Sequence, residues 1–324
     1  VNTNLLKRLR GTERDPIPFL VCSGGTTSRA AADNHWTIDL RKNYRNISFN
    51  SSKNEVEIEA GVTMGDLTSL LNKYRRSFPI GLSGITGMGY IITGGVSPLS
   101  RNRGLAIDQL LEIKGYWGTG EKFHLSRPDS TKELNLEWKS LCGAAAFLGI
   151  VTKVKLKTQP LKPLLIWSAN LSSGNLSECI YQAEDWPNAI SLQWSWGENI
   201  FAYAIGEVEN NEQENSLLNL LEKLPFSTNK RIKRIYSMEK LPKFSPTKKS
   251  SQNTKHSEVL GLLGPAWQSH NFKVINKIQN LINKRPDNSC YIAAQQLGGE
   301  VNNSKTIETS FIHRDAIWKP WING

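Results

Sequence analysis

The sequence predicts an α+β protein with two lobes. Its first half alternates short apolar runs with an amphipathic helix, and its second half places tryptophan-rich strands between helices. Pro160 and Pro163 mark the change between these two textures, so we expect one domain over residues 1–158 and another over residues 159–324. A chain of 324 residues is long enough to bury a sizeable core in each.

The elements of the first half follow from its periodicity. Residues 55–60 alternate polar and apolar with period two, which is typical of a half-buried strand that ends at Gly61. Thr63 predicts the N-cap of an amphipathic helix, with Asp66 three residues further on. Further strands are predicted over residues 17–22, 37–40, 110–116 and 147–156.

The elements of the second half are longer and richer in tryptophan. Strands are predicted over residues 164–169, 190–196, 200–208 and 289–297, and helices over residues 217–224 and 271–284. On the strand 190–196, Trp194 and Trp196 share one face while Gln193 points to the other.

Two glycine-rich turns, about sixty residues apart, each follow an apolar run. They consist of Ser23, Gly24, Gly25, Thr26, Thr27 and Ser28 in the first, and of Ser83, Gly84, Gly87, Met88, Gly89, Thr93, Gly94 and Gly95 in the second. Glycine lets the main chain approach a ligand closely, and successive N–H groups form a concave nest for an anion. A single turn of this kind is usually only a tight connection, but the pair predicts a long, phosphate-bearing cofactor.

Composition excludes some classes of protein. The net charge of +11 favours an anionic partner, but the basic segment 230–256 has no interleaved aromatics or motif, so we expect a surface loop and no nucleic acid. No apolar stretch reaches the roughly 20 residues that a membrane span needs. The four cysteines lack metal-ligand spacing, so we expect no metal site and a reducing, cytoplasmic location.

A larger set of motifs occurs in a fixed order along the chain. They are Ser23-Gly24-Gly25, Ile38-Asp39-Leu40, Glu59-Ala60-Gly61-Val62-Thr63, Gly94-Gly95, Leu99-Ser100-Arg101, Gly104-Leu105-Ala106-Ile107-Asp108, Trp138 with Gly143, Gly149-Ile150-Val151-Thr152, Gly298-Gly299 and Phe311-Ile312-His313-Arg314-Asp315-Ala316. With these motifs the chain resembles the PCMH-type FAD-binding fold shared by vanillyl-alcohol oxidase and the berberine bridge enzyme family.

The resemblance implies a PCMH-type FAD-binding domain followed by a substrate domain with an antiparallel sheet and helices. The two glycine turns would hold the FAD pyrophosphate and pass along the isoalloxazine, and Gly149, Ile150 and Val151 would contact the adenine end. The implied function is an FAD-dependent oxidoreductase, an oxidase or a dehydrogenase, that takes hydride from an alcohol, a sugar or a similar small molecule. Its other partner would be an electron acceptor, oxygen or another molecule.

The chain departs from the family at the positions of the covalent flavin tethers. The histidine tether falls on Thr26 and the cysteine tether on Ser83, so we expect a non-covalent flavin. The segments before Pro16 and after Gly324 that the family carries are missing, and we expect the chain to be incomplete at both ends.

The catalytic base is the weakest part of the resemblance. The family's glutamate falls on Asn303, a neutral amide that cannot accept a proton near pH 7. His313 is a second candidate, although pairing with an acid is the favoured interpretation. An inactive relative that acts as a binding or interaction protein is therefore the alternative hypothesis.

Candidates for the substrate site are aromatic or amide side chains. Trp194 and Trp196 could stack a sugar or an aromatic substrate, although core packing is the favoured interpretation. Gln295 and Gln296 lie near a strand end and could reach the same pocket, with Gln296 as the candidate we select.

Overall fold

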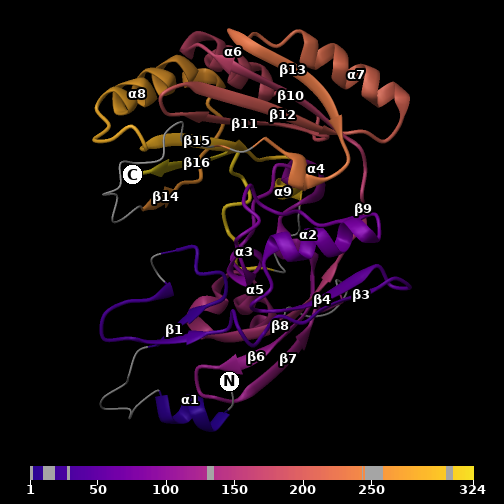
Figure 1. Ribbon diagram of the computed structural model, residues 1–324, viewed down its shortest axis with the longest axis vertical. Helices are drawn as coiled ribbons and strands as arrows, with labels where there is room; N and C mark the ends of the chain where they lie inside the picture. Colours follow the sequence, from indigo (N-terminus) through magenta and orange to yellow (C-terminus); the bar gives the residue numbers. More distant parts are fainter. Residues whose placement is uncertain are drawn as a thin grey trace. The chain divides into compact units, whose positions relative to one another are not determined.

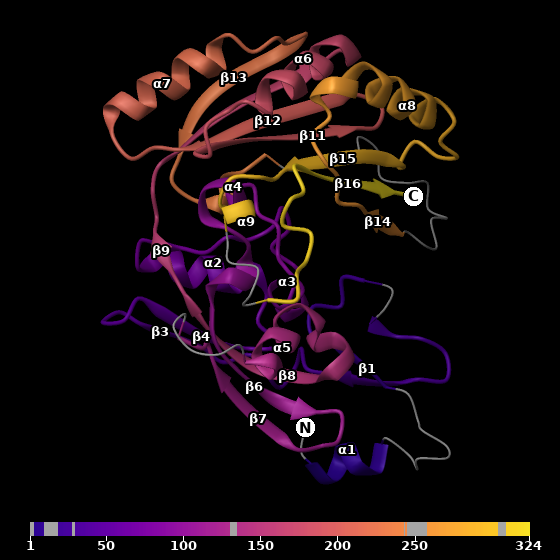
Figure 2. The same cartoon turned by 180° about the vertical axis from the view of Figure 1, so that it is seen from behind.

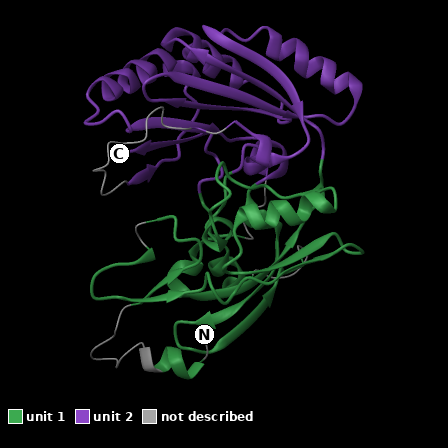
Figure 3. Ribbon diagram, in the orientation of Figure 1, with its two compact units in different colours: residues 1–96, 105–161, 305–312 green, residues 97–104, 162–304, 313–324 purple. Residues whose placement is uncertain are grey.

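Each of the two units of the fold takes its residues from separate stretches of the chain (Figure 3). Unit 1 consists of residues 1–96, 105–161 and 305–312, and unit 2 of residues 97–104, 162–304 and 313–324. The computed structural model describes residues 3–9, 19–27, 30–129, 135–242, 244, 258–303 and 309–324.

Unit 1 is built on a five-stranded antiparallel sheet (Figure 1). Its strand order is β3 (Ile47–Asn50), β4 (Glu55–Glu59), β8 (Gly149–Lys157), β6 (Leu110–Trp117) and β7 (Lys122–Ser126). Two smaller sheets pair β1 (Phe19–Cys22) with β2 (Trp36–Asp39) in parallel, and β5 (Arg76–Ser77) with β9 (Gln159–Pro160) antiparallel. The described helices are α1 (Thr3–Leu9), α2 (Met64–Lys73), α3 (Met88–Ile92), the 3₁₀ turn η2 (Ala106–Gln109) and α5 (Leu136–Leu148).

Strand β4 and helix α2 confirm the predictions made for them. Val56 and Ile58 are buried and their neighbours on β4 are half-buried. The Thr63 amide donates to the Asp66 carboxylate at 3.1 Å, and the Thr63 hydroxyl accepts from the Asp66 amide at 3.1 Å. This capping box satisfies two amides that the first turn of a helix leaves without partners.

The strand predicted from residue 147 begins two residues later, at Gly149. Phe147 and Leu148 instead complete α5, which bends at Gly143, where φ is 133°. Three consecutive alanines precede Phe147, and alanine is the strongest helix former. The apolar run predicted a strand at Phe147 and Leu148, but the helix propensity of the preceding alanines extends α5 over both residues. The prediction is therefore wrong at these two residues.

Unit 2 contains the antiparallel sheet that the sequence predicted, flanked by helices (Figures 1 and 2). Its strand order is β13 (Thr228–Ile235), β10 (Leu164–Leu171), β12 (Ile200–Glu207), β11 (Ile190–Trp196), β15 (Tyr291–Gln296), β16 (Trp318–Asn323) and β14 (Val259–Gly261). The described helices are α4 (Ser100–Arg103), α6 (Ser173–Ala183), α7 (Asn211–Glu222), η3 (Met238–Lys240), η4 (Gln268–His270), α8 (Asn271–Asn283) and α9 (Glu300–Asn303). No helix in the described parts of the chain is long and apolar enough to cross a lipid bilayer.

Helices α6, α7 and α8 cover one face of this sheet (Figures 1 and 2). Leu176, Leu217 and Ile275, one from each helix, belong to the same buried cluster as Trp194 on β11. The strand residues of this cluster alternate along the chain, so the side chains between them lie on the opposite face of the sheet.

Part of the basic segment is an edge strand and not a loop. Residues 228–235 form β13, which pairs with β10 and has no described strand on its other side. Its exposed Arg231 and Lys233 alternate with the half-buried Ile232. Charged side chains at a sheet edge discourage pairing with another chain, which gives this part of the segment a structural role. Residues 245–257 of the segment lie outside the described residues.

Two arginines of α4 are buried inside unit 2. Arg101 donates to three main-chain carbonyls, those of Trp186 at 2.7 Å, Ile190 at 3.0 Å and Leu297 at 2.7 Å. Burial lowers the pKa of the Arg101 guanidinium to about 10. Arg103 forms an ion pair with Glu207, whose carboxylate is fully buried. Segment 97–104 is thereby bonded to the sheet of unit 2 near the start of β11, the end of β12 and the end of β15.

The sheet of unit 1 carries acidic and basic side chains on neighbouring strands. Lys153 pairs with Glu57 at 3.0 Å, and Glu112 accepts hydrogen bonds from Lys155 and, at 3.0 Å, from His124. The bond from Lys155 is the largest cause that lowers the pKa of Glu112, to about 2, and the bond from His124 adds to it.

We predict that Glu112→Gln destabilises the protein by about 1 kcal/mol at pH 7, because water screens part of this pairing. The pKa of Glu112 is lowered in the folded state, so its contribution is complete above the ordinary carboxyl pKa and is lost as the pH falls toward about 2. Urea unfolding between pH 7 and pH 3 should show a difference from wild type that shrinks below about pH 4.5. Glu121→Gln, in an exposed turn, is the control and should leave stability unchanged at every pH. A constant difference for Glu112→Gln would contradict the assignment.

Candidate cofactor and substrate sites

The first glycine turn follows directly from β1. The Leu40 amide donates to the Cys22 carbonyl at 2.9 Å, which fixes the end of the strand from which the turn leaves. Gly25 has φ +66°, a conformation that favours glycine. The Arg41 guanidinium lies against Gly25 and is bound by Asp39, with 2.6 Å between Arg41 Nη2 and Asp39 Oδ2. The turn therefore has a fixed cation beside it.

The two predicted glycine turns pack against each other, main chain to main chain. A Cβ added to Gly24 would lie 2.5 Å from the Gly87 nitrogen, and one added to Gly87 would lie 2.7 Å from the Gly24 nitrogen. The Gly89 amide also donates to the Ser23 hydroxyl at 3.3 Å. Two segments separated by 60 residues of sequence thus form one surface.

Helix α2 supports the second turn from behind. The Met64 amide donates to the Thr86 carbonyl at 2.8 Å, and the Gly65 amide donates to the Gly84 carbonyl at 2.8 Å. These are amides of the first helical turn, which have no acceptor within the helix. The capping box at Thr63 and these two bonds together set the position of the second turn.

The donors that remain on this surface fit a pyrophosphate. Among the described residues, the amides of Gly24, Thr26 and Gly87 have no protein acceptor. A Cβ added to Gly89 would meet only the Ser23 hydroxyl, at 3.9 Å, so the space above Gly89 is open. Neighbouring N–H groups in turns bind anionic oxygens, and the small side chains leave room for them. The residues present are therefore suited to FAD; Ser28 lies outside the described residues.

Close packing requires the glycines in the later part of the second turn. The Gly94 and Gly95 carbonyls accept from the Ile107 and Ala106 amides at 2.9 Å each. A Cβ on Gly95, where φ is +78°, would lie 2.4 Å from the Ala106 Cβ. Met88 is buried, whereas Thr93 is exposed and its hydroxyl donates to the Gly89 carbonyl at 2.7 Å. Cofactor contacts at these four residues stay a prediction.

Gly149, Ile150 and Val151 form the start of β8 and pair with β6. A Cβ on Gly149 would lie 2.3 Å from the Tyr116 carbonyl oxygen, so the approach of the two strands requires glycine here. Ile150 and Val151 are buried. The adenine contact expected at these residues stays a prediction, as does the absence of a tether at the exposed Thr26 and Ser83.

In unit 2, four polar side chains form a row across the sheet face that the helices do not cover. The cross-strand pairs are Tyr203 with Gln193, Gln193 with Gln295, and Gln295 with Lys319. These residues come from the neighbouring strands β12, β11, β15 and β16, so the row crosses three strand spacings, roughly 14 Å. We call these four residues the polar row.

Three atoms of the polar row are buried without a hydrogen-bond partner among the described residues: Tyr203 Oη, Gln193 Oε1 and Gln295 Nε2. The orientation of Gln193 is fixed, because its Nε2 donates to the Ser191 hydroxyl at 2.8 Å and that hydroxyl donates to the Pro98 carbonyl. Burial raises the pKa of Tyr203 well above its ordinary value. Buried polar atoms are nearly always paired in native proteins, so these three atoms are candidates for hydrogen bonds to a ligand or to ordered water.

The aromatic candidates from the sequence lie on the other face. Trp194 is fully buried in the core, with its ring centroid 6.2 Å from that of Trp267, and Trp196 belongs to the same cluster. Core packing therefore accounts for both, as the favoured interpretation had it. Gln296 also lies on that face, where its Oε1 accepts from the Leu192 amide at 2.9 Å and its Nε2 donates to the Ala183 carbonyl.

The two candidate bases are separate from the polar row. Asn303 ends α9, is exposed, and places its amide 3.5 Å from the Glu300 carboxylate. His313 is also exposed. Neither lies on a strand of the sheet, and an acid–base role for them stays a prediction.

Sequence reasoning did not single out Tyr203 and Lys319, which the structure places at the two ends of the polar row. A signal for them exists, because the strands 200–207 and 318–323 alternate, so residues of odd number point away from the core tryptophans. What the sequence lacks is the order of the strands, which brings four residues of different strands into one row.

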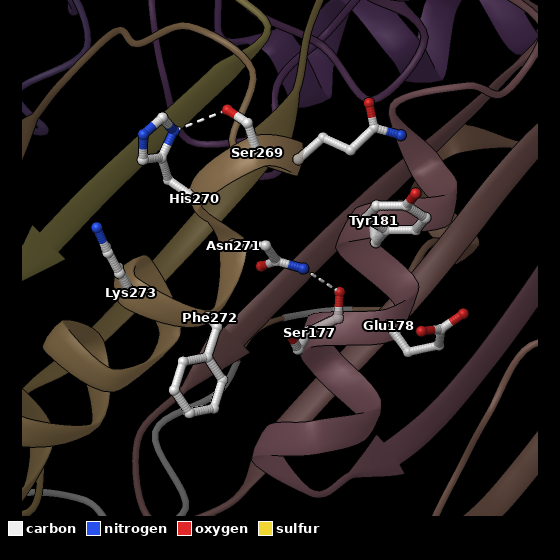
Figure 4. Close-up of a pocket in the computed structure, with 9 residues that line it drawn as sticks. Ser177, Glu178, Tyr181, Ser269, His270, Asn271, Phe272 and Lys273 are labelled. Atoms are coloured by element: carbon white, nitrogen blue, oxygen red, sulfur yellow. Dashed lines mark hydrogen bonds between the residues drawn. The ribbon is translucent and has the colours of Figure 1, made fainter.

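A hollow of about 400 Å³ lies apart from these residues, between α6 and the start of α8 (Figure 4). Tyr181, His270 and Phe272 contribute to its lining, and the Asn271 amide donates to the Ser177 carbonyl beside it. No residue predicted for a site lines this hollow.

Comparisons with known proteins identify a domain type and a set of similar proteins. The family described as FAD binding domain matches residues 4–126. An uncharacterised FAD-linked oxidoreductase of Bacillus subtilis, YgaK, is 24% identical over 325 residues, which cover 96% of this chain and 70% of the relative. The fold is similar to that of a chitooligosaccharide oxidase, with a TM-score of 0.76, 18% identity, and coverage of 95% of this chain and 69% of the other. It is also similar to berberine bridge enzyme from Eschscholzia californica, with a TM-score of 0.74, 16% identity, and coverage of 99% and 68%.

Sequence and fold together define an FAD-dependent enzyme of the oxidoreductase class. The chain is similar to FAD-linked oxidoreductases over nearly its whole length and has the PCMH-type fold of the berberine bridge enzyme-like proteins. The resemblance, the fold class and the FAD cofactor predicted from the sequence are confirmed, and no relative found supports an inactive binding protein.

We predict that Gly89→Ala weakens FAD binding at least tenfold without destabilising the apoprotein. The added methyl group meets only the Ser23 hydroxyl at 3.9 Å, and alanine favours a helix more than glycine does. Any loss of affinity would therefore come from the space that the cofactor occupies. Titration with FAD, followed by flavin fluorescence, measures the change.

Gly174→Ala is the matched control for this variant. Gly174 lies in α6, and a Cβ there would meet a single neighbour, the Ser172 hydroxyl, also at 3.9 Å. This substitution should leave FAD affinity unchanged. Equal affinities for Gly89→Ala and wild type would show that the cofactor does not pass Gly89.

Proposed function

We propose that this chain binds FAD without a covalent bond and oxidises a hydroxylated organic molecule, an alcohol or a sugar. The observation that carries the choice of donor is the polar row, with its three buried and unpartnered atoms. FAD, when bound, accepts a hydride from the carbon that bears the hydroxyl group, and its two electrons then pass to oxygen or another acceptor. The protein supplies binding and orientation.

The two glycine turns are the proposed cofactor site. The unpartnered amides of Gly24, Thr26 and Gly87 would donate to the pyrophosphate oxygens, and Arg41 would add a positive charge beside them. Thr26 and Ser83 carry neutral hydroxyls, which are weaker nucleophiles than the histidine and cysteine of the family's tethers, and this supports a flavin held by non-covalent contacts alone.

The polar row is the proposed donor site. The Gln193 carbonyl oxygen would accept from a substrate hydroxyl, and the Gln295 amide would donate to one. Because burial keeps the pKa of Tyr203 high, its phenol stays protonated at neutral pH and would donate to a substrate oxygen. Phe244 and Trp321, with ring centroids 6.1 Å apart, would supply an apolar surface on the same face.

Two kinds of relatives suggest different donors. Structures of similar fold include a chitooligosaccharide oxidase and a xylooligosaccharide oxidase in complex with xylobiose, whereas a 31% identical relative over part of the chain is an O-acetylstemmadenine oxidase. A largely apolar donor would leave the buried atoms of the polar row unpaired, at about 1–3 kcal/mol for each. This cost favours a hydroxylated donor.

We further propose a reducing, cytoplasmic location. The four cysteines are all free and buried, which is the usual state of thiols in a reducing compartment.

Acid precipitation of the purified holoprotein tests the non-covalent flavin. We expect absorbance bands near ~370 and ~450 nm to move from the protein into the supernatant. Colour that remains in the pellet would mean that a residue other than the expected tether positions is bonded to the flavin. A colourless protein that also fails to take up added FAD would contradict the proposal itself.

We predict that Tyr203→Phe lowers kcat/KM for a hydroxylated donor about two- to tenfold and leaves the Tm unchanged or higher. The substitution removes a hydroxyl that has no partner in the protein, so folding loses nothing, whereas the donor loses a hydrogen bond. Thermal unfolding and steady-state kinetics measure the two effects separately. Tyr181→Phe, which removes a phenol from the exposed side of α6, should change neither quantity. A lower Tm for Tyr203→Phe would reveal a structural role for the hydroxyl instead.

A further inference from the structure

The polar row ends in a cation. Lys319 lies on β16 directly opposite Gln295 and on the same sheet face. Its ammonium group lies 5.0 Å from the centroid of the Trp321 ring, two residues along the same strand. The row therefore offers three neutral groups followed by one positive charge.

Lys319 has no carboxylate partner among the described residues. Two buried arginines of unit 2 are satisfied by the protein: Arg103 pairs with Glu207, and Arg101 donates to three carbonyls. Lys319 is half-buried, and desolvation of its ammonium group lowers its pKa, because a charge taken out of water costs free energy unless it is paired. The aromatic contact stabilises the ammonium only in part.

From this geometry we infer that the donor is an anionic, hydroxylated molecule, such as a sugar acid, whose carboxylate binds Lys319. The hydroxyl groups of a single sugar ring would meet Gln295 and Gln193, the neighbours of Lys319 in the row, and a longer donor would also reach Tyr203. One ammonium balances one carboxylate, whereas a phosphate monoester carries about −1.5 to −2 charges and would remain partly uncompensated. This inference rests on the proposed function, since it names the substrate class of the same site.

The test compares neutral and anionic sugars on the FAD-loaded protein. Binding of glucose, glucuronate and glucose 6-phosphate would be measured by calorimetry, and flavin reduction by each would be followed anaerobically. We expect glucuronate to bind at least tenfold more tightly than glucose, and more tightly than glucose 6-phosphate.

Two substitutions assign the preference to Lys319. Lys319→Met should weaken glucuronate binding by about ten- to a hundredfold and glucose binding by a much smaller factor, whereas Lys319→Arg should keep most of the preference. Lys277→Met makes the same change of charge on the exposed side of α8 and should leave all three affinities as in wild type.

The outcomes separate this inference from the proposed function. Equal affinities for glucose and glucuronate would overturn the inference of an anionic donor, as would a preference for glucuronate that survives in Lys319→Met. In either case, flavin reduction by glucose would still support oxidation of a hydroxylated donor. A stronger preference for glucose 6-phosphate would overturn the carboxylate. Binding of glucuronate through Lys319 without flavin reduction by any of the three sugars would uphold the anion site and contradict the proposed donor class.

Discussion

The main-chain contact between Gly24 and Gly87 is the constraint on which the cofactor half of the molecule depends. Each residue excludes a side chain on the other, since a Cβ on Gly24 would lie 2.5 Å from the Gly87 nitrogen. The first turn of α2 then holds Gly84 and Thr86 from behind. Packing and capping therefore fix the positions of the anion-binding amides before any ligand arrives, so that the conformational cost of ordering them falls on folding and not on binding.

The substrate half depends on a different constraint, the alternation of side chains in a strand. In β11, Trp194 serves the core while Gln193, its neighbour in sequence, serves the polar row. A shift of one residue in register would exchange these roles completely. Packing of the bulky core face therefore determines which side chains lie on the polar face of the sheet.

Local signals predicted local structure well. The capping box at Thr63, the alternation of β4 and the two glycine turns could all be recognised within a few residues, because each depends on neighbours in sequence. The predictions of secondary structure failed where contacts between residues distant in sequence determine the structure. Phe147 continues a helix in spite of its apolar run, and Lys230 belongs to an edge strand because β10 lies beside it. The row of Tyr203, Gln193, Gln295 and Lys319 could not be predicted for the same reason, since only strand order determines which polar residues become neighbours.

The short helix α4 packs in unit 2 but lies far in sequence from the strands of that unit. Its residues belong to that unit although the chain on either side belongs to the other, and Arg103 meets Glu207 across 104 positions of sequence. Residues 162–304 alone would therefore lack the arginine that neutralises the buried Glu207 carboxylate, so the sheet of unit 2 depends on a segment that lies within the sequence of unit 1.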